Sequence, residues 1–398
     1  MVWTRWLFVF RIPLPPYGIL MRGLSTAFFL RLGRNLQEYD AKYHFDGDSF
    51  VVECDYEDLL DAFAVTFDKA SEIMENKLNS KPGDIKLHRN DVRSLKKNGI
   101  DVSSEYCCQF TVNFCKSMAN DLSIGDVKSV ANVKAKGDKV YFGDGKIALF
   151  QMFGVEKYSS ANRFMKSNLT NFVYRYHVND VWLGILLSGF SFTYSGYFNQ
   201  NVILLVPPED FSHDVGIYDK FTMSSLNVKG SDPIQAYVIL ITLSTLREYM
   251  RKRVEVFLDP TATFNLTIYK ISRQGNTFTL TSQVEQNFSQ IFEFATRYLR
   301  YYSEKLGDDL SENTQLEEAL EKIIRLVSGG KGKADKYQRA AFMLYDAIHK
   351  SHDAYDMIYF FGRELSQKAC EQTRKKGYWL FRGDGGKEFG AILYGLGV

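Results

Sequence analysis

The sequence predicts an α+β protein, with a mixed α/β N-terminal region that carries β-hairpins and a helical C-terminal domain. Three observations indicate this class: a strand-like apolar run feeds a helix at the start, hairpin patterns fill the middle, and strand patterns end after Val284. The 398 residues exceed what one hydrophobic core usually covers. We therefore expect an α/β region at 1–130, a hairpin-rich region with one buried helix at 131–283, and a helical domain with a basic tail at 284–398.

The first elements are a strand and two helices. The run WLFVFRIPLPP is apolar and ends in prolines, which is typical of a strand, and GILMRGLSTAFFLRLG follows as a helix that we expect Gly33 to close. Residues 55–78 are predicted to form a longer helix, because their apolar side chains recur at helical spacing and the first turn is acidic. Residues 81–98 are polar and basic, and we expect them to form a loop.

The middle of the chain shows three hairpin patterns. KVYFGDGKIALF predicts a hairpin that turns at Asp144-Gly145, and FNLTIYKISRQGNTFTLT predicts one that turns at 274–276. Residues 181–208 contain no charged residue, but GFSFTYSGYF alternates aromatic and hydroxyl side chains before an Asn-Gln-Asn turn. This period of two favours a third hairpin over a membrane-spanning helix.

The remaining patterns are helical. One helix is predicted to begin at Ser231-Asp232-Pro233, within the hairpin-rich region, and to end in cations at 247–253, where the helix dipole favours positive charge. Further helices are expected at 286–305, at 313–327 and at 336–370, the last one broken near His352.

Composition and cysteine usage limit the function classes. With 45% apolar and 24% charged residues the chain is a folded protein, and five cysteines without a CxxC pair favour a reduced, cytoplasmic chain with buried free thiols and no metal. Arg11 and Arg22 interrupt both N-terminal apolar runs, which argues against a signal sequence or a membrane anchor. We therefore expect a cytoplasmic protein without a cofactor and without a membrane partner.

Enzyme motifs are absent from the sequence. SGGKGKA lacks the P-loop pattern, because Val327 replaces its first glycine and Ala334 its hydroxyl residue. No GxSxG, HExxH or strand-to-helix GxGxxG occurs either. Scattered catalytic residues leave no motif, so a metal-dependent phosphoesterase or nuclease stays open as an alternative. Its candidate ligands are His349, His352, Asp353 and Asp356, or the dyad His213-Asp214.

Basic residues are interleaved with aromatic ones in KYSSANRFMKSNLTNFVYRYH, residues 157–177. This mixture is typical of a surface that binds phosphates and stacks on bases, although a core helix with solvated lysines gives the same pattern. Three further basic clusters lie at 251–253, 331–333 and 374–376. The cations that we expect to bind nucleic acid in the four clusters are Arg163, Lys166, Arg175, Arg251, Lys252, Arg253, Lys331, Lys333, Arg374, Lys375 and Lys376.

The first predicted helix carries an arginine among apolar residues. At about 100° per residue, Arg22, Ser25 and Thr26 fall along one stripe of this helix, and Gly23 beside them leaves room for another backbone. An arginine and two hydroxyls suit a sugar-phosphate chain that crosses the helix, so we expect these residues to bind nucleic acid. The alternative is close packing on a neighbouring element, with Arg22 paired to one of the acids that follow Glu38.

The segment PLPPYGILMRGLSTAFFLRLG, followed by a β-rich middle and a helical C-terminal third, resembles the large subunit of archaeal type I-A CRISPR interference (Cascade) complexes, the Csa4-like branch of the Cas eight family. The sharpest overlap runs from Tyr17-Gly18 through Arg22-Gly23 to Gly33, and the rest depends on size and domain order. The cysteine pairs that mark zinc modules in some relatives are absent here, so the resemblance implies no metal.

The resemblance implies a non-catalytic subunit in antiviral defence. Such a subunit lies at the 5′-handle end of the CRISPR RNA beside other subunits of the complex, helps to recognise the protospacer-adjacent motif in target DNA, and recruits the helicase-nuclease. Arg11 and Arg22 would then contact the guide or DNA backbone, and the basic C-terminal region would line the path of the displaced strand. A protein-interaction scaffold, whose basic clusters bind acidic partners, is the remaining alternative.

Overall fold

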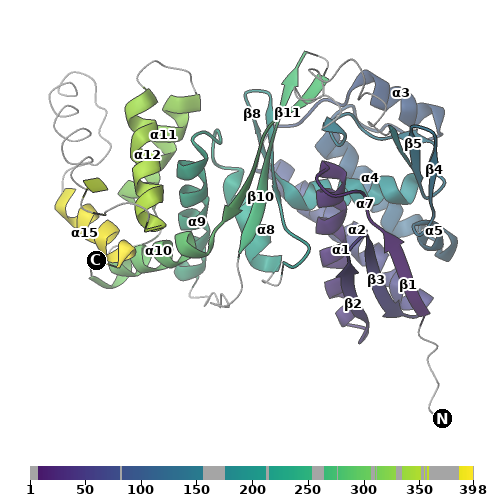
Figure 1. Cartoon of the computed structure of the whole chain (residues 1–398), viewed down its shortest axis with the longest axis horizontal. Coiled ribbons are helices and arrows are strands. Elements are labelled where there is room, and N and C mark those ends of the chain that lie inside the picture. The colour runs from purple at the N-terminus through teal and green to yellow at the C-terminus, as the bar shows by residue number, and fades with distance from the viewer. Residues whose placement is uncertain are drawn as a thin grey trace, which may run out of the picture. The chain divides into compact units, whose positions relative to one another are not determined.

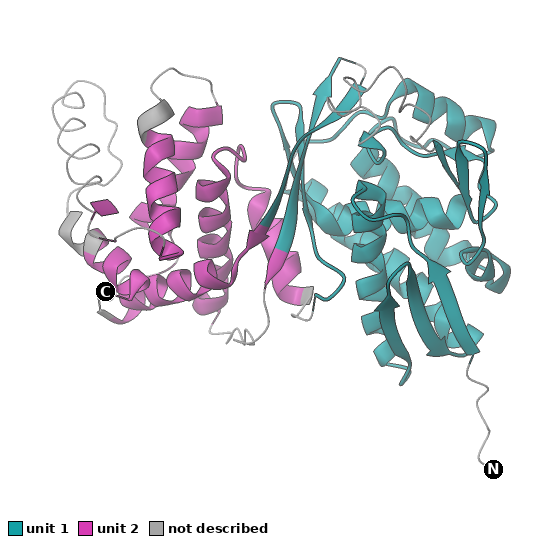
Figure 2. Cartoon of the chain, viewed as in Figure 1, with its two compact units in different colours: residues 1–211, 266–285 teal, residues 212–265, 286–398 magenta. Residues whose placement is uncertain are grey.

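The structure is a computed structural model, and it confirms the mixed α+β class (Figure 1). The chain forms two compact units: unit 1 contains residues 1–211 and 266–285, and unit 2 contains residues 212–265 and 286–398 (Figure 2). Each unit is therefore built from two separate stretches of the chain. The residues that the structure describes are 8–80, 83–155, 175–211, 215–252, 264–275, 277–305, 310, 312–328, 334–350, 354, 356–357 and 385–397.

The N-terminal part of unit 1 combines a three-stranded antiparallel sheet with two helices, α1 (Leu20–Gln37) and α2 (Tyr56–Asn79). The expected strand and the expected long helix are confirmed. Asp55 is the N-cap of α2, and its carboxylate accepts a hydrogen bond from the backbone N–H of Asp58 at 2.8 Å. The strands, in the order in which they pair, are β1 (Phe8–Pro13), β3 (Ser49–Cys54) and β2 (Lys42–Asp46).

Gly33 does not close α1, which continues to Gln37. A Cβ atom at Gly33 would lie 2.5 Å from the ring of Tyr43, so the glycine provides the space that β2 needs beside the helix. The expected C-cap is therefore a packing residue, because a contact with the following strand and not the end of the helix determines its role.

Residues 180–193 form a helix, α7 (Asp180–Thr193), where the alternating aromatic and hydroxyl residues predict a strand. Every residue of α7 after Asp180 is buried, so the helix has no polar face and its sequence lacks the helical period. The later part of the expected hairpin is confirmed, because β8 (Tyr194–Phe198) and β9 (Asn201–Val206) pair antiparallel. In the part of the chain that the structure describes, no helix has the length and the apolar character needed to cross a membrane.

A second sheet of unit 1 has the strand order β11-β10-β9-β8. The predicted hairpin of β10 (Asn265–Gln274) and β11 (Thr277–Asn287) is confirmed. β10 pairs antiparallel with β9, which joins residues 266–285 to unit 1, while the intervening stretch 212–265 belongs to unit 2. The boundaries of the units therefore differ from those of the expected region 131–283. The sequence pattern divides the chain into consecutive regions, and it does not show which distant strands pair.

The third sheet of unit 1 has the strand order β4-β5-β7-β6. The predicted hairpin across Asp144-Gly145 is wrong, because β7 lies between β5 and β6 and pairs with both. A Cβ atom at Gly145 would lie 2.0 Å from the backbone of Val178, so this glycine lets the turn pass close to β7. The strands are β4 (Val133–Lys136), β5 (Lys139–Phe142), β6 (Ile147–Ala148) and β7 (Arg175–Val178).

Further helices of unit 1 are α3 (Arg89–Lys97), α4 (Cys107–Asp121) and α5 (Ile124–Ser129). The loop expected at 81–98 is wrong, because residues 89–97 form α3. The helix is hard to recognise in the sequence, since most of its residues are polar and Leu95 is its one fully buried apolar side chain.

Burial raises the pKa of the Cys115 thiol in α4 to about 12, which keeps it protonated and unreactive. The described cysteines are buried free thiols, as expected, at Cys54, Cys107, Cys108 and Cys115, and Cys370 lies outside the described residues.

Unit 2 is mainly helical in its described part, and α8, α10, α11 and α12 all pack against α9 (Ile234–Arg251). α9 confirms the helix predicted after Ser231-Asp232-Pro233. The helix expected at 336–370 ends at Ile348, and the position of the expected break, His352, lies outside the described residues. Further elements of the unit are α8 (Val215–Ser225), α10 (Ser289–Arg300) with the π-helical turn Tyr301–Lys305, α11 (Gln315–Ser328), α12 (Ala334–Ile348) and α15 (Gly385–Leu396).

Candidate nucleic-acid interface

Arg22 lies buried in unit 1, with 4% of its surface exposed. Its Nε donates to Oε1 of Glu209 at 2.6 Å, Nη1 donates to the carbonyl of Pro15 at 2.9 Å, and Nη2 donates to the carbonyl of Gly47 at 2.6 Å. The guanidinium carbon also lies 3.4 Å from the ring centroid of Tyr17. These contacts tie α1 to the segments around it, and they occupy the groups that would otherwise hold a phosphate.

The other residues of the Arg22 stripe are buried as well. Ser25 is fully buried and its Oγ donates to the carbonyl of Arg22 at 2.8 Å, and Thr26 is 2% exposed. Gly23 faces β9, where Cγ1 of Val206 would lie 2.7 Å from a Cβ atom at the glycine. The expected open stripe is therefore corrected to a packed one, as in the alternative that the sequence left open. The close ion-pair partner of Arg22 is Glu209, while Asp48, one of the acids after Glu38, lies 3.8 Å from its Nη1. A strand and a carboxylate far away in the sequence cover this side of the helix.

Arg11 and Arg175 are exposed, and each pairs with one acid. Nη1 of Arg11 lies 2.6 Å from Oδ2 of Asp46, and Nε of Arg175 lies 3.3 Å from Oδ2 of Asp138. Both pairs stand in solvent, which makes them weak, so both cations stay accessible to a phosphate. The predicted residues that lie outside the described part of the chain are Arg163, Lys166, Arg253, Lys331, Lys333, Arg374, Lys375 and Lys376.

The sheet β4-β5-β7-β6 has an apolar face and a basic face. Residues that oppose each other in paired strands point to the same side, so the register divides the side chains of the sheet into two sets. On the apolar face, Phe142 and Val178 are buried, and the ring centroid of Phe142 lies 4.8 Å from that of Trp182. The other side, which we call the basic sheet face, carries Lys134, Lys136, Lys139, Tyr141, Ala148, Arg175 and His177.

A row of three cations crosses the basic sheet face. Lys136 on β4 is opposite Lys139 on β5, and Lys139 is opposite Arg175 on β7. Arg175 pairs with the carboxylate of Asp138, whereas Lys136 and Lys139 form no ion pair with any residue that the structure describes. Like charges in opposing positions destabilise a sheet, so a bound anion would offset a cost that the free protein carries.

The neighbouring row of this face carries two stacked rings. Tyr141 on β5 is opposite His177 on β7, and their ring centroids lie 5.1 Å apart with an interplanar angle of 26°. Burial lowers the pKa of His177 below its ordinary value, the carbonyl of Arg175 opposes this effect, and the charges of Lys139 and Arg175 add to it. The imidazole is therefore neutral near pH 7 and offers a flat ring beside the cations.

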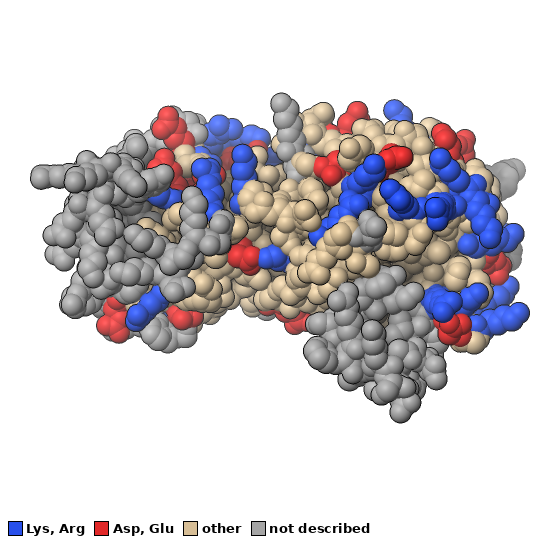
Figure 3. Space-filling model, turned by 90° about the horizontal axis from the view of Figure 1, so that it is seen from above, with Lys and Arg blue, Asp and Glu red and all other residues tan. Residues whose placement is uncertain are grey.

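Helix α3 adds cations at the β6 edge of the sheet. The backbone N–H of Ala148 donates to Oγ of Ser94 at 3.1 Å, and the N–H of Gln151 donates to the carboxylate of Asp91, so α3 is held beside β6. In Figure 3, Lys and Arg side chains gather over the end of unit 1 where α3, β4 and β5 lie in Figure 1. The exposed cations of α3 are Arg89, Arg93, Lys96 and Lys97.

Sequence reasoning found Arg175 and missed the other members of the basic sheet face. The alternation in KVYF and RYHV is a usable signal, because it places Lys139 with Tyr141 and Arg175 with His177 on one side of each strand. It does not show that β5 and β7 are neighbours, since a long segment separates them in the chain. The parallel pairing that brings the two pairs together therefore had to come from the structure.

The described metal-ligand candidates do not form a site. His349 stacks on Tyr345 with ring centroids 4.1 Å apart, and Asp356 is exposed. Within the described ranges, no group of three or more His, Cys, Asp or Glu side chains is placed to hold a metal ion. The remaining candidates, His213, Asp214, His352 and Asp353, lie outside those ranges.

Arg251 and Lys252 lie at the end of α9 in unit 2, in different surroundings. Nζ of Lys252 is 2.8 Å from Oε1 of Glu248, one turn earlier in the helix. Arg251 forms no ion pair with another described residue, and it lines a pocket of about 400 Å³. Of these two predicted cations, Arg251 is therefore the one that is open to an anionic ligand.

The basic sheet face, with cations in one row and stacked rings in the next, is thus the part of unit 1 best suited to a nucleic-acid chain. The choice of this face as the candidate site depends on its geometry and on the sequence. Comparison with known protein families and with curated proteins finds no match to this chain.

Proposed function

We propose that the chain binds single-stranded nucleic acid on the basic sheet face of unit 1, without catalysis. The observation that carries this proposal is the row of Lys136, Lys139 and Arg175 beside the stacked rings of Tyr141 and His177. Cations in a line follow a phosphate backbone, and exposed flat rings stack on unpaired bases. Adjacent rows of one sheet provide both contacts to the same strand.

Two of the three strands that carry the row of cations are packed from below, which supports the use of the basic sheet face as a binding surface. Neighbouring strands lie about 4.8 Å apart, so the three cations span roughly 10 Å. β5 and β7 are fixed from below by Phe142 and Val178, whose side chains are in the core, whereas β4, which carries Lys136, is exposed on both of its faces. Side chains on strands with a packed underside hold their positions better than side chains on loops, which lowers the entropy lost on binding.

We further propose, on the resemblance of the N-terminal segment, that the chain is a non-catalytic large subunit of an archaeal CRISPR RNA-guided surveillance complex in antiviral defence. Its partners would be CRISPR RNA, target DNA, the other subunits of the complex and the helicase-nuclease. In such complexes guide pairing reads the sequence, while protein groups hold backbones and read a short motif. A face of cations and rings suits the task of holding a backbone.

The first test measures binding of a labelled, unstructured single-stranded RNA to the full chain by fluorescence anisotropy over a range of salt concentrations. The variant K136Q/K139Q/R175Q is expected to bind more weakly and to reduce the salt slope by about 2, because each phosphate contact on a single strand contributes roughly 0.7. The charge-matched control K42Q/K69Q/K116Q changes exposed lysines elsewhere in unit 1 and is expected to bind as the wild type does. Equal losses of RNA affinity in both variants would show that binding depends only on net charge, and would reject the basic sheet face as the binding site.

A second test separates stacking from charge. Tyr141→Ala removes one ring of the stacked pair and is expected to weaken RNA binding about 5- to 150-fold, since one stacked base contributes roughly 1–3 kcal/mol. Tyr141→Phe keeps the ring and is expected to bind as the wild type does. If the alanine variant also binds unchanged, the rings have no part in recognition.

The CRISPR assignment has its own test. The affinity of the full chain for a CRISPR repeat-derived RNA is compared with its affinity for a scrambled RNA of equal length and for a short duplex DNA. A preference for the repeat RNA supports the assignment, and equal affinity for both RNAs rejects it while leaving nucleic-acid binding intact. If none of the three binds at low salt, the scaffold alternative replaces the proposal.

A further inference from the structure

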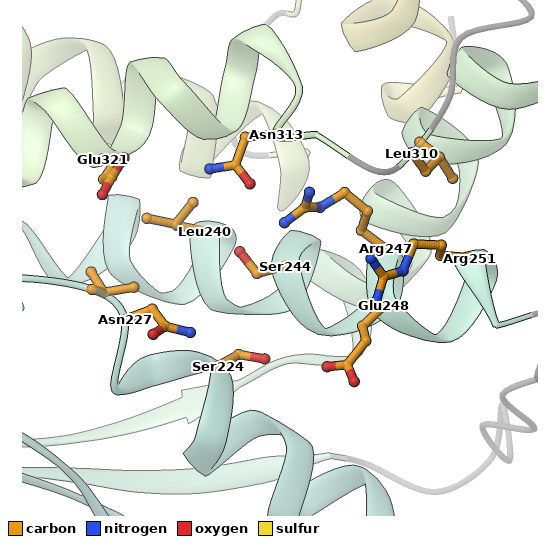
Figure 4. Close-up of a pocket in the computed structure, with 11 residues that line it drawn as sticks. Ser224, Asn227, Leu240, Ser244, Arg247, Glu248, Arg251, Leu310, Asn313 and Glu321 are labelled. Carbon is orange, nitrogen blue, oxygen red and sulfur yellow. The ribbon is translucent and has the colours of Figure 1, made fainter. Parts of the chain in front are cut away.

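We infer that the pocket of unit 2 binds a small organic phosphate of mononucleotide size. Its volume of about 400 Å³ lies within the usual range of ligand pockets, about 300–1,000 Å³. The walls come from α9, from the end of α8 and the residues after it, and from α11 and the segment that leads into it (Figure 4). The site lies within unit 2, so the inference does not depend on the basic sheet face.

Two arginines reach the pocket from successive turns of α9. Nε of Arg247 lies 3.1 Å from Oε1 of the fully buried Glu317, and the two side chains form an ion pair on one side of the guanidinium. Figure 4 shows the other end of this guanidinium extending between Asn313 and Ser244. Arg251 is one turn further along the helix and, as described above, has no ion-pair partner among the described residues. Both guanidiniums thus have donors free for an anion.

The acidic residues of the wall are neutralised by cations outside the pocket. Oε1 of Glu248 lies 2.9 Å from Nζ of Lys220 and 2.8 Å from Nζ of Lys252. Oε1 of Glu321 lies 2.5 Å from Nη2 of Arg325. These three cations do not line the pocket. Because Glu317 balances the charge of Arg247, the positive charge of the pocket comes from Arg251, which has no ion-pair partner among the described residues.

The remaining lining suits the rest of an organic phosphate. The planar fork of a guanidinium matches the oxygens of a phosphate. The amides of Asn227 and Asn313 can exchange hydrogen bonds with a sugar or a base, and Leu240 and Leu310 can cover the face of a ring. Inorganic phosphate alone would leave most of the pocket empty, which favours a larger ligand.

The test is calorimetric titration of the full chain with AMP and with ribose 5-phosphate, with adenosine as the phosphate-free control. We expect at least one of the two phosphates to bind and adenosine not to bind. Arg251→Gln is expected to weaken this binding at least 10-fold, and because Arg251 is exposed the variant keeps its fold. The matched control Arg300→Gln changes an exposed arginine of α10 outside the pocket and is expected to bind as the wild type does.

Three results would overturn the inference: no binding of either phosphate at millimolar concentration, equal binding of adenosine and AMP, or unchanged affinity in Arg251→Gln. The variant K136Q/K139Q/R175Q is titrated in parallel. It is expected to bind the phosphate normally, because its changes are confined to unit 1. Failure of the RNA experiments therefore leaves this result untouched, and failure here leaves the RNA experiments untouched.

Discussion

Single buried cations in unit 1 have partners that lie far away in the sequence. Lys77 of α2 is fully buried, and its Nζ donates to the carbonyls of Ser191 at 2.8 Å, Phe192 at 3.2 Å and Tyr194 at 2.6 Å. Burial lowers its pKa well below the ordinary value, and the charge of Arg31 lowers it further. Nζ lies within hydrogen-bond distance of all three carbonyls, so this lysine caps the C-terminal end of α7 from inside the core.

Arg22 and Arg11 allow a direct comparison between a buried and an exposed ion pair. Arg22→Met is expected to lower the free energy of unfolding by about 3 kcal/mol, because it leaves the carboxylate of Glu209 and two backbone carbonyls without their donor. Arg11→Met removes a pair with Asp46 that stands in solvent and should change the same quantity by less than about 1 kcal/mol. Urea unfolding at neutral pH measures both, and equal losses would contradict the role of burial.

Glu388 is expected to make the stability of unit 2 depend on pH. Its side chain is 1% exposed, the hydroxyl of Tyr298 donates to its Oε1 at 2.6 Å, and burial raises its pKa to about 7. The unfolded chain ionises this carboxyl near pH 4.5. The folded state keeps the proton above that pH, so the contribution of Glu388 is fully present below pH 4.5 and is lost as pH rises through about 7.

Glu388→Gln removes this titration and tests the expectation. The fall in the free energy of unfolding between pH 4.5 and 7 should become smaller in the variant, by on the order of 3 kcal/mol. Urea unfolding of the wild type and the variant at several pH values provides the comparison. If the free energy of unfolding of the variant falls as steeply with pH as that of the wild type, other carboxyls cause the pH dependence.

Among the elements, α1 and α7 approach so closely that only a glycine fits between them. A Cβ atom at Gly189 would lie 2.0 Å from the carbonyl oxygen of Leu24, and Gly189→Ala is expected to destabilise the protein by about 3 kcal/mol, because backbone does not move aside as a side chain does. The control is Gly125→Ala in α5, where the nearest atom would lie at 3.7 Å. It should gain up to about 1 kcal/mol from better helix propensity.

Thermal unfolding of the two glycine variants distinguishes a steric clash at the contact of α1 with α7 from a general effect of replacing glycine in a helix. Opposite shifts of Tm support the close approach of α1 and α7. Losses of similar size in both variants would point to a general cost of replacing glycine in these helices.

Elements that carry their own local signals could be predicted from the sequence, and elements defined by distant contacts could not. The sequence predicts α2 because its apolar residues recur at helical spacing after an acidic first turn, and it predicts the β10–β11 hairpin because Gly275 lies in its turn. The sequence of α7 lacks the helical period because the helix is buried on all sides, so its pattern predicts a strand. Gly33 has the sequence context of a helix cap, because its contact with Tyr43 depends on the fold. The same holds for the candidate site. Arg175 could be predicted because it lies in a basic run, whereas its neighbours Lys136 and Lys139 could not, because only strand pairing brings β4 and β5 beside it.

In the whole molecule, the chain passes between the two units at 211/212, 265/266 and 285/286. A fragment that contains residues 212–398 keeps the β10–β11 hairpin but loses β9, so the edge of β10 is left unpaired. We expect this fragment to aggregate, because an exposed apolar edge strand pairs with other chains. Size-exclusion chromatography of the purified fragment measures this outcome.

The matched fragment replaces residues 267–284 with a short Gly-Ser linker. The two ends of the hairpin are neighbours, because β10 and β11 pair, so a short linker spans the gap. This second fragment is expected to run as a monomer. Aggregation of both fragments would show that unit 2 does not fold without unit 1, and two monomeric fragments would show that the β10 edge is harmless.

The inner position of β7 in its sheet also sets an order in time. During synthesis β4, β5 and β6 leave the ribosome well before β7, and until Val178 has emerged Lys139 and Tyr141 lack the strand that completes their rows. An incomplete chain therefore lacks the pairs that Lys139 forms with Arg175 and Tyr141 forms with His177. The basic sheet face is completed in one step, when β7 inserts between β5 and β6, so the charged and aromatic rows arise together and late in synthesis.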